Sequence, residues 1–176
     1  MLPPPAPRRP RTAASKIVSR AEASGLRQEW RAAGRRVVFT NGCFDLLHAG
    51  HVSYLEAARK LGDALVIGLN SDASVRRVKG SSRPIVPERE RAEVLGALAC
   101  VDAVTFFDEE TPLAIVTELL PDVLVKGADW AADAIVGSEI VTQAGGQVVR
   151  VPLVAGRSTT AIIAAVQAGR TLGPGE

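Results

Sequence analysis

Both histidines of the 176-residue chain, His48 and His51, lie three positions apart in the stretch VVFTNGCFDLLHAGH. Residues three apart on a helix share one face, so both imidazoles would project toward the same space. A helix that starts directly after a strand offers unpaired backbone N–H groups and the positive end of its dipole. Gly50, between the histidines, lets a bulky anion approach the backbone. This pattern favours binding of a phosphoryl group on which negative charge develops.

Two other interpretations of the histidine pair stay open. Zinc-binding histidines on a helix usually lie four residues apart with a carboxylate between them, whereas here the spacer is Ala49-Gly50 and the one nearby thiol is Cys43. The pair could also be two ordinary histidines bonded to backbone groups. The chain lacks the glycine-rich dinucleotide fingerprint and the P-loop, so a phosphate would be held by other groups.

Apolar runs that predict strands alternate along the chain with helical patterns. Strands are expected at residues 35–40, 64–70, 101–107, 122–127 and 147–154. Helices are expected within HVSYLEAARKLG, SDASVRRVK, ERERAEVLGALA, TPLAIVTELL, IVGSEIVTQAGG and STTAIIAAVQAG. Near-continuous apolar strands separated by helices predict a parallel sheet covered on both faces. The fold class is therefore α/β, a single doubly wound Rossmann-like domain with a five-stranded parallel sheet and helices on both faces.

Composition predicts one folded domain at residues 16–170, between a disordered Pro/Arg-rich tail at 1–15 and a flexible C-terminus at 171–176. Residues 1–36 hold nine Lys/Arg and two Asp/Glu, so the basic character belongs to the leading segment, and nucleic-acid binding is disfavoured. No apolar run approaches the roughly 20 residues of a membrane helix. Without an export signal, Cys43 and Cys100 are expected to be free thiols in a cytoplasmic protein.

Ligands of doubly wound sheets bind beyond the carboxyl ends of the strands. The segments that follow strand ends are TNGCFDLLHAGH, LNSD to KGSSRPI, VKGADW and VAGRSTT, and they carry the most unusual side chains. The turn residues Thr40, Asn41, Gly42 and Phe44 either form a simple turn or present N–H groups to a phosphate. Asp45 is expected to cap the helix that follows.

TNGCFDLLHAGH resembles the signature of the HxGH nucleotidyltransferase superfamily, whose members join a phosphate-bearing substrate to a nucleotide and release pyrophosphate. GRSTT at residues 156–160 resembles the closing Ser-Thr-Thr element of that superfamily. From about Lys16 to Gln167 the chain is similar to bacterial heptose-1-phosphate adenylyltransferases. The matching stretches are TNGCFDLLHAGHVSYLEAARKLGD, GLNSDASVRRVKG, RPIVPERERAEVL, PDVLVKGADW and GRSTTAII.

In many bacteria this activity is the carboxyl-terminal domain of a bifunctional sugar kinase, and with no kinase domain in the sequence a single-activity version is expected. Gly127-Ala128-Asp129-Trp130 stands where the resemblance leads us to expect Gly-Gly-Asp-Tyr. Asp-Trp at this point is also similar to glycerol-3-phosphate cytidylyltransferases. The choice between ATP and CTP therefore stays open.

The resemblance implies attack by a sugar 1-phosphate, heptose 1-phosphate, on the α-phosphorus of ATP, with Mg²⁺ carried by ATP and no dedicated metal site. It implies catalytic roles for His48, His51 and Lys79. Nucleotide-binding residues would be Thr40, Asn41, Gly42, Phe44, Lys126, Gly127, Asp129, Arg157, Ser158, Thr159 and Thr160. Sugar-phosphate-binding residues would be Asn70, Asp72, Arg83 and Arg91. The implied partners are ATP, the sugar 1-phosphate and further copies of the chain in a homo-oligomer, without nucleic acid or membrane.

Each of these residues also has a purely structural interpretation. Lys79 and Lys126 could be surface or snorkelling lysines. Asp72, or Ser71 beside it, and the hydroxyls of 158–160 could be helix caps. Arg91 could pair with Glu88 on its own helix. The alternatives in function are a cytidylyltransferase, an adenylyltransferase with another phosphate substrate, and a nucleotide-binding module without catalysis.

Overall fold

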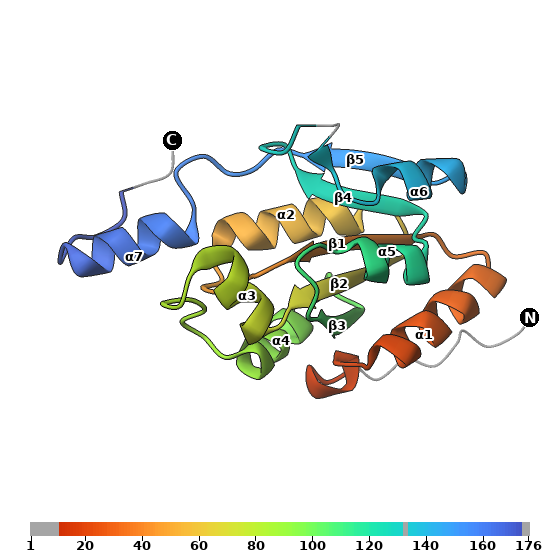
Figure 1. The fold of residues 1–176 in the computed structure, drawn as a ribbon, viewed down its shortest axis with the longest axis horizontal. Helices are drawn as coiled ribbons and strands as arrows, with labels where there is room; N and C mark the ends of the chain where they lie inside the picture. The colour runs from red at the N-terminus through yellow and green to blue at the C-terminus, as the bar shows by residue number, and fades with distance from the viewer. Residues whose placement is uncertain (1–10, 132–133, 174–176) are drawn as a thin grey trace, which may run out of the picture.

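Five parallel strands form one sheet in the order β3-β2-β1-β4-β5 in the computed structural model, which describes residues 11–131 and 134–173 (Figure 1). The strands are β1 (Val37–Gly42), β2 (Ala64–Asn70), β3 (Ala103–Phe107), β4 (Val123–Gly127) and β5 (Gln147–Val151). The chain starts in the centre and winds outward to one edge, then returns to the centre and winds to the other edge. The predicted α/β fold with a doubly wound five-stranded parallel sheet is confirmed.

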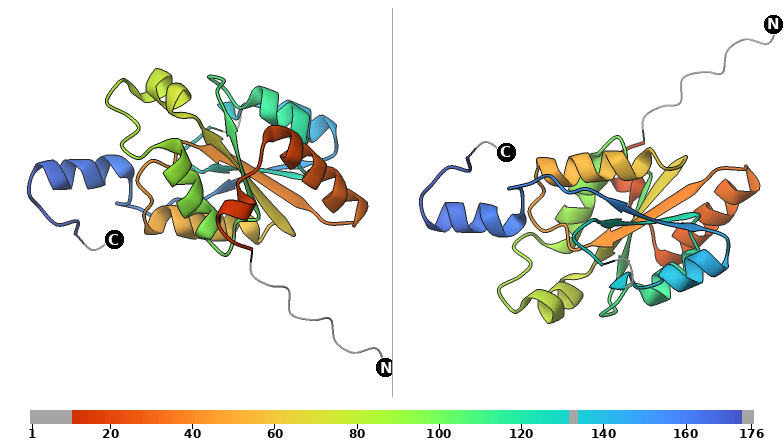
Figure 2. Two further views of the ribbon diagram at one scale, coloured as in Figure 1. Left: turned by 90° about the horizontal axis from the view of Figure 1, so that it is seen from below. Right: turned by 90° about the horizontal axis from the view of Figure 1, so that it is seen from above.

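Helices cover both faces of this sheet (Figure 2). The helical segments of the described chain are a 3₁₀ turn η1 (Ala14–Lys16), α1 (Arg20–Ala32), α2 (Ala49–Arg59), α3 (Asp72–Lys79), α4 (Glu88–Ala97), α5 (Leu113–Leu119), α6 (Ser138–Gln143) and α7 (Thr159–Gln167), and all but α7 lie against the rest of the domain. Side chains of α2 and α4 enter one apolar core, and those of α1, α5 and α6 enter the other. Strand β1 supplies both cores, with Val38 on one face and Val37 and Phe39 on the other, as strand alternation requires.

Helix α1 was not predicted from the sequence, although its start carries a complete capping box. The Ser19 side chain accepts from the Glu22 N–H, and the Glu22 carboxylate accepts from the Ser19 N–H at 2.7 Å. Ala23 and Trp30 are buried against the sheet, and Arg27 reaches across to Asp122. The prediction for residues 1–36 relied on their positive charge and did not identify this helix, because only a narrow stripe of the helix is apolar.

The boundaries of the ordered domain differ from the predicted ones at the leading end. Residues 1–10 lie outside the described residues, but 11–15, which the sequence analysis places in the tail, contact the domain. Arg11 donates to the Asp102 carbonyl at 3.0 Å, and Ile17 forms a parallel bridge with Val104. The strand predicted at 147–154 ends at Val151, because Pro152 has no N–H to donate to a sheet.

Helix α7 differs from the other α-helices in its surroundings. It stands apart from the sheet in each view, and none of its residues is fully buried (Figures 1 and 2). Its first turn, however, lies beside the start of α2, because Thr159 Oγ1 donates to the Leu46 carbonyl at 3.4 Å. No helix among the described residues is long and apolar enough to cross a membrane.

Candidate active site

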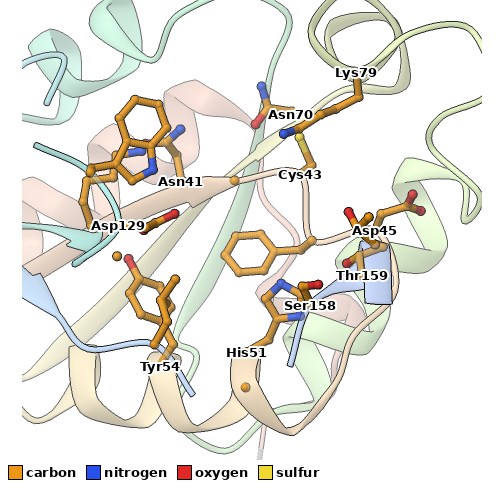
Figure 3. Close-up of a pocket in the computed structure, with 18 of the residues that line it drawn as sticks. Asn41, Cys43, Asp45, His51, Tyr54, Asn70, Lys79, Asp129, Ser158 and Thr159 are labelled. Carbon is orange, nitrogen blue, oxygen red and sulfur yellow. The ribbon is translucent and has the colours of Figure 1, made fainter. Parts of the chain in front are cut away.

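A cavity of about 490 Å³ opens at the carboxyl ends of the central strands, where the fold rule places a ligand (Figure 3). The ends of β1 and β4, the starts of α2 and α7, and the segment after α3 surround it. The predicted site residues that line it are Asn41, Gly42, Phe44, His48, His51, Asn70, Lys79, Arg83, Lys126, Gly127, Asp129, Arg157, Ser158, Thr159 and Thr160. Four segments distant in sequence therefore meet around one cavity.

The two histidines form a stacked pair at the start of α2. His48 is the N-cap residue with extended backbone angles, and its ring lies 3.9 Å from the ring of His51 at an interplanar angle of 29°. Phe44, in a left-handed backbone conformation with φ 44°, places its ring 5.3 Å from that of His51. A Cβ on Gly50 would lie 2.9 Å from His48 Nδ1 and 3.2 Å from the Arg157 Cβ, so glycine permits this close packing.

The surroundings of the pair favour neutral imidazoles. Burial, and then the charge of His48, lowers the pKa of His51 to about 4. Burial, and then the charge of Arg157, lowers the pKa of His48 as well. In the described part of the chain, the buried Nδ1 atoms of both rings have no hydrogen-bond partner. Buried polar atoms without partners are rare in proteins, and here they belong to two residues that line the cavity.

The start of α7 lies beside the histidines at the cavity, because Arg157 packs against Gly50 next to His48. Ser158 is its N-cap, with its hydroxyl accepting from the Ala161 N–H at 3.1 Å, so the cap interpretation of this residue is confirmed. Arg157, Thr159 and Thr160 line the cavity beside it. Two helix starts and one guanidinium thus surround the same space, which favours an anion.

The end of β4 contributes a buried lysine. Lys126 Nζ donates to Asn41 Oδ1 at 2.5 Å and lies 5.5 Å from the centre of the Trp130 ring. Burial lowers the pKa of Lys126 to about 8, against the opposing charge of Asp129. The Asp129 carboxylate and the Leu153 side chain both lie close to Gly127, where a Cβ would require them to move.

Three predicted site residues do not line the cavity. Thr40 is buried and shares a hydrogen bond of 2.8 Å with the Tyr54 hydroxyl. Asp72 accepts from Arg91 Nη2 at 2.7 Å, and Arg91 pairs with it rather than with Glu88. The Arg91 guanidinium is fully buried and also donates to the carbonyls of Cys43, Asn70 and Val86. Asp72 and Arg91 therefore shape the site from outside the cavity.

Asp45 has a different role from the predicted one. The N-cap of α2 is His48, and the Asp45 carboxylate instead accepts from Arg83 and from the backbone of Ile85 and Val86. The sequence carries no signal for this contact, because the partners lie about 40 residues away.

Sequence reasoning also missed Tyr54, which lines the cavity. Tyr54 follows His51 by one helical turn, and that spacing could have identified it.

The described residues contain no group of three or more His, Cys, Asp or Glu side chains that could hold a metal ion. Burial raises the pKa of the Cys43 thiol, which disfavours the thiolate that zinc requires. The charged lining of the cavity holds four cations, Lys79, Arg83, Lys126 and Arg157, and three carboxylates, Asp45, Glu110 and Asp129, of which Asp45 is paired with Arg83. This lining fits a phosphate-rich ligand.

Comparison with known proteins agrees with this chemistry. The family model described as "Cytidylyltransferase-like" matches residues 39–165. The protein named "Bifunctional protein HldE" from Azorhizobium caulinodans is 58% identical over 148 residues, which cover 84% of this chain and 31% of that protein. Its namesake from Mesorhizobium japonicum is 57% identical over 155 residues, which cover 88% of this chain and 31% of that protein. The chain thus spans about a third of the length of these curated relatives.

Two solved structures are similar to this chain in fold. The lipopolysaccharide core biosynthesis protein from Thermoplasma volcanium is 30% identical, with a TM-score of 0.57 over 68% of this chain and 97% of that one. Pantoate-β-alanine ligase from Francisella tularensis matches with a TM-score of 0.57 over 82% of this chain and 68% of that one, at 11% identity, and shares the fold alone. Since the family model spans more than half of the sequence, the chain belongs to the cytidylyltransferase-like family of HxGH nucleotidyltransferases.

Proposed function

We propose that the chain is an adenylyltransferase that converts heptose 1-phosphate and ATP to ADP-heptose and pyrophosphate. The observation that carries the reaction type is the stacked, neutral His48–His51 pair, which lines the cavity together with Arg157 and the start of α7. The choice of sugar rests on the similarity to heptose-1-phosphate adenylyltransferases across most of the chain.

In this reaction an oxygen of the sugar phosphate forms a bond to the α-phosphorus of ATP, and the bond from that phosphorus to the bridging oxygen of pyrophosphate breaks. The attacking oxygen is already anionic, so alignment and charge neutralisation are the main requirements. His48 and His51 would donate hydrogen bonds to the α-phosphate as charge develops. Arg157 and the N–H groups at the start of α7 would hold the departing pyrophosphate.

Magnesium would reach this cavity with the nucleotide. Four cations of its lining, Lys79, Arg83, Lys126 and Arg157, suit the phosphate oxygens through which the nucleotide would hold the ion. When bound, magnesium neutralises part of the triphosphate charge. Lys79 and Arg83 would neutralise the charge of the acceptor phosphate from the side of α3.

A substrate matrix tests the proposal directly. Purified protein would be incubated with ATP or CTP, each combined with heptose 1-phosphate or glycerol 3-phosphate, and pyrophosphate release would be followed. We expect release with ATP and heptose 1-phosphate. Release with CTP alone would refute the adenylyltransferase and favour the cytidylyltransferase that Asp129-Trp130 resembles. Nucleotide binding without pyrophosphate release in any combination would identify a binding module.

The expected homo-oligomer finds support in the surroundings of α7. The sequence has no charged residue between Arg157 and Arg170, and the Val166 side chain is 74% exposed. A helix that is apolar on most sides is usually covered by another element. Sedimentation at several protein concentrations tests this expectation, and a monomer at every concentration would contradict it. The predicted cytoplasmic location stays a prediction.

A further inference from the structure

The carboxylate of Asp45 lies in the loop between β1 and α2, three residues before His48, and its side chain is 1% exposed. It accepts hydrogen bonds from Arg83 Nε at 2.5 Å, from the Ile85 N–H at 2.8 Å and from the Val86 N–H at 2.9 Å. All three donors belong to residues 80–87, the loop that joins α3 to α4. One buried carboxylate therefore ties the histidine-bearing loop to a second loop at the cavity.

The loop at 80–87 begins directly after Lys79, and its first three residues are exposed. Two hydrogen bonds hold the backbone of Val86 in this loop. Its N–H donates to Asp45, and its carbonyl accepts from Arg91 Nε at 2.9 Å. Arg91 also donates to the Cys43 carbonyl in the histidine-bearing loop. The two loops are thus joined from two sides, and the position of Arg83 depends on this junction.

Arg83 lines the cavity, and its side chain is 18% exposed. Asp45 engages the Nε edge of its guanidinium, and within the described part of the chain no protein acceptor bonds the two terminal nitrogens. A guanidinium held at one edge presents its remaining donors in a fixed plane, which is the geometry that binds a phosphate at two oxygens.

We propose that Asp45 is a positioning residue, which holds Arg83 and the loop at 80–87 so that the Arg83 terminal nitrogens bind the phosphate of the sugar acceptor opposite His48 and His51. This inference rests on the proposed function and adds a residue to it. Asp45 itself need not touch either substrate, because its oxygens are occupied by Arg83, Ile85 and Val86.

The ionisation of Asp45 is consistent with this role. Burial by itself would raise the pKa of its carboxyl, but the Val86 and Ile85 amides and the Arg83 guanidinium hold the pKa below its ordinary value. The carboxylate therefore stays charged, and keeps its hydrogen bonds, at any pH near neutrality.

The test compares Asp45→Asn and Arg83→Gln with the wild type in steady-state kinetics for each substrate. Loss of a hydrogen bond to a charged group should raise the KM for heptose 1-phosphate about tenfold or more in either variant. The KM for ATP should change less than about threefold, since that substrate is held from α7 and β4. If Asp45 acts through Arg83, the double variant should be no worse than the poorer single variant. Equal increases in both KM values, or multiplied effects in the double variant, would overturn the proposal.

Asp102→Asn is the matched control. The Asp102 carboxylate accepts from Arg59 Nε at 3.0 Å and from the Leu65 N–H at 2.9 Å, the same kind of contact at the opposite edge of the sheet. It should leave both KM values unchanged. A rise in the KM for heptose 1-phosphate in this variant as large as in Asp45→Asn would attribute the effect to general destabilisation and refute the proposal.

Hydrogen exchange supplies a readout that needs no substrate. Amides of Ile85 and Val86 should exchange faster in Asp45→Asn than in the wild type, while those of β1 and β2 should not, and unchanged exchange would refute the anchoring role. If Asp45→Asn does not fold, Arg83→Gln carries the kinetic test, because Arg83 is partly exposed. A wild type that releases no pyrophosphate would refute the proposed function, whereas an active wild type with unchanged variant kinetics would refute only the role of Asp45.

Discussion

Polar side chains serve different purposes at the two ends of the parallel strands. We call the side where the strands begin the amino edge of the sheet and the side where they end the carboxyl edge. At the amino edge, Asp63, Asp102 and Asp122 each directly precede a strand, and each carboxylate accepts from a backbone N–H in or directly before a neighbouring strand. Asp102 and Asp122 also pair with Arg59 and Arg27. At the carboxyl edge, the imidazoles of His48 and His51 have buried nitrogens without partners in the described part of the chain.

This difference separates polar groups that stabilise the fold from those available to a ligand. A carboxylate whose hydrogen bonds are complete contributes to stability and has no capacity left for substrate. A buried imidazole with an unused nitrogen lowers stability unless something binds it. Asp45 is an exception to this division, because it is a carboxylate with complete hydrogen bonds that nevertheless lies at the cavity. The following predictions test whether this division holds.

The largest effect is expected at the carboxyl edge, for His48→Ala and His51→Ala. Each substitution removes one of the donors that we propose for the α-phosphate, so kcat should fall on the order of 100-fold or more. Because each ring also fills part of the cavity wall, thermal unfolding of each variant should be measured beside its kinetics. Turnover within a few-fold of the wild type in a folded variant would remove the histidines from the chemistry.

A smaller effect is expected for Lys79→Gln, which removes a cation at the end of α3 that lines the cavity. The loss of a charge-assisted contact should lower kcat/KM about tenfold to 100-fold. Arg76→Gln is the matched control, since Arg76 is an exposed cation on the same helix and does not line the cavity. If both substitutions reduce kcat/KM equally, the general positive field of α3 matters rather than the position of Lys79.

The sheet could be predicted from sequence because its strands are short apolar runs between helical patterns. Strand β2 is an example, since its sequence ALVIGLN is almost entirely apolar and all seven of its residues are buried. Helix α1 escaped because its apolar stripe is narrow and its charges dominate the local composition. Helix α7 was found, but its position away from the sheet depends on tertiary contacts that no local pattern encodes.

The site could be predicted where local rules place side chains at strand ends. His48, His51 and the start of α7 follow such ends, and the fold brings them to one cavity. The resemblance implied that Arg91 and Asp72 bind the sugar phosphate, yet the two side chains pair with each other outside the cavity. The sequence shows the charges but not which of them are satisfied by one another.

A pH effect on stability should follow from His51. Its pKa is about 4 in the folded chain, below the ordinary value near 6.5, so the unfolded chain binds more protons between these values. The folded chain therefore gains stability from a neutral His51. This stability is fully present above about pH 6.5 and is lost as the pH falls toward 4. Urea unfolding at pH 7 and pH 5 should show a smaller acid loss in His51→Gln than in the wild type. Equal losses would mean that the ring is not held neutral by its surroundings.

The smallest functional effect is expected at the amino edge, for Asp102→Asn. Its two contacts, to Arg59 and to the Leu65 N–H, join the segment before β3 to the end of α2 and the start of β2, and none of these residues lines the cavity. Removing the charge should lower the free energy of unfolding by about 1–3 kcal/mol, measured by urea denaturation. Both KM values and kcat should stay at the wild-type level, because no lining residue depends on these contacts. A loss of turnover without a loss of stability would mean that the amino edge also takes part in function, and the division between the two edges would have to be abandoned.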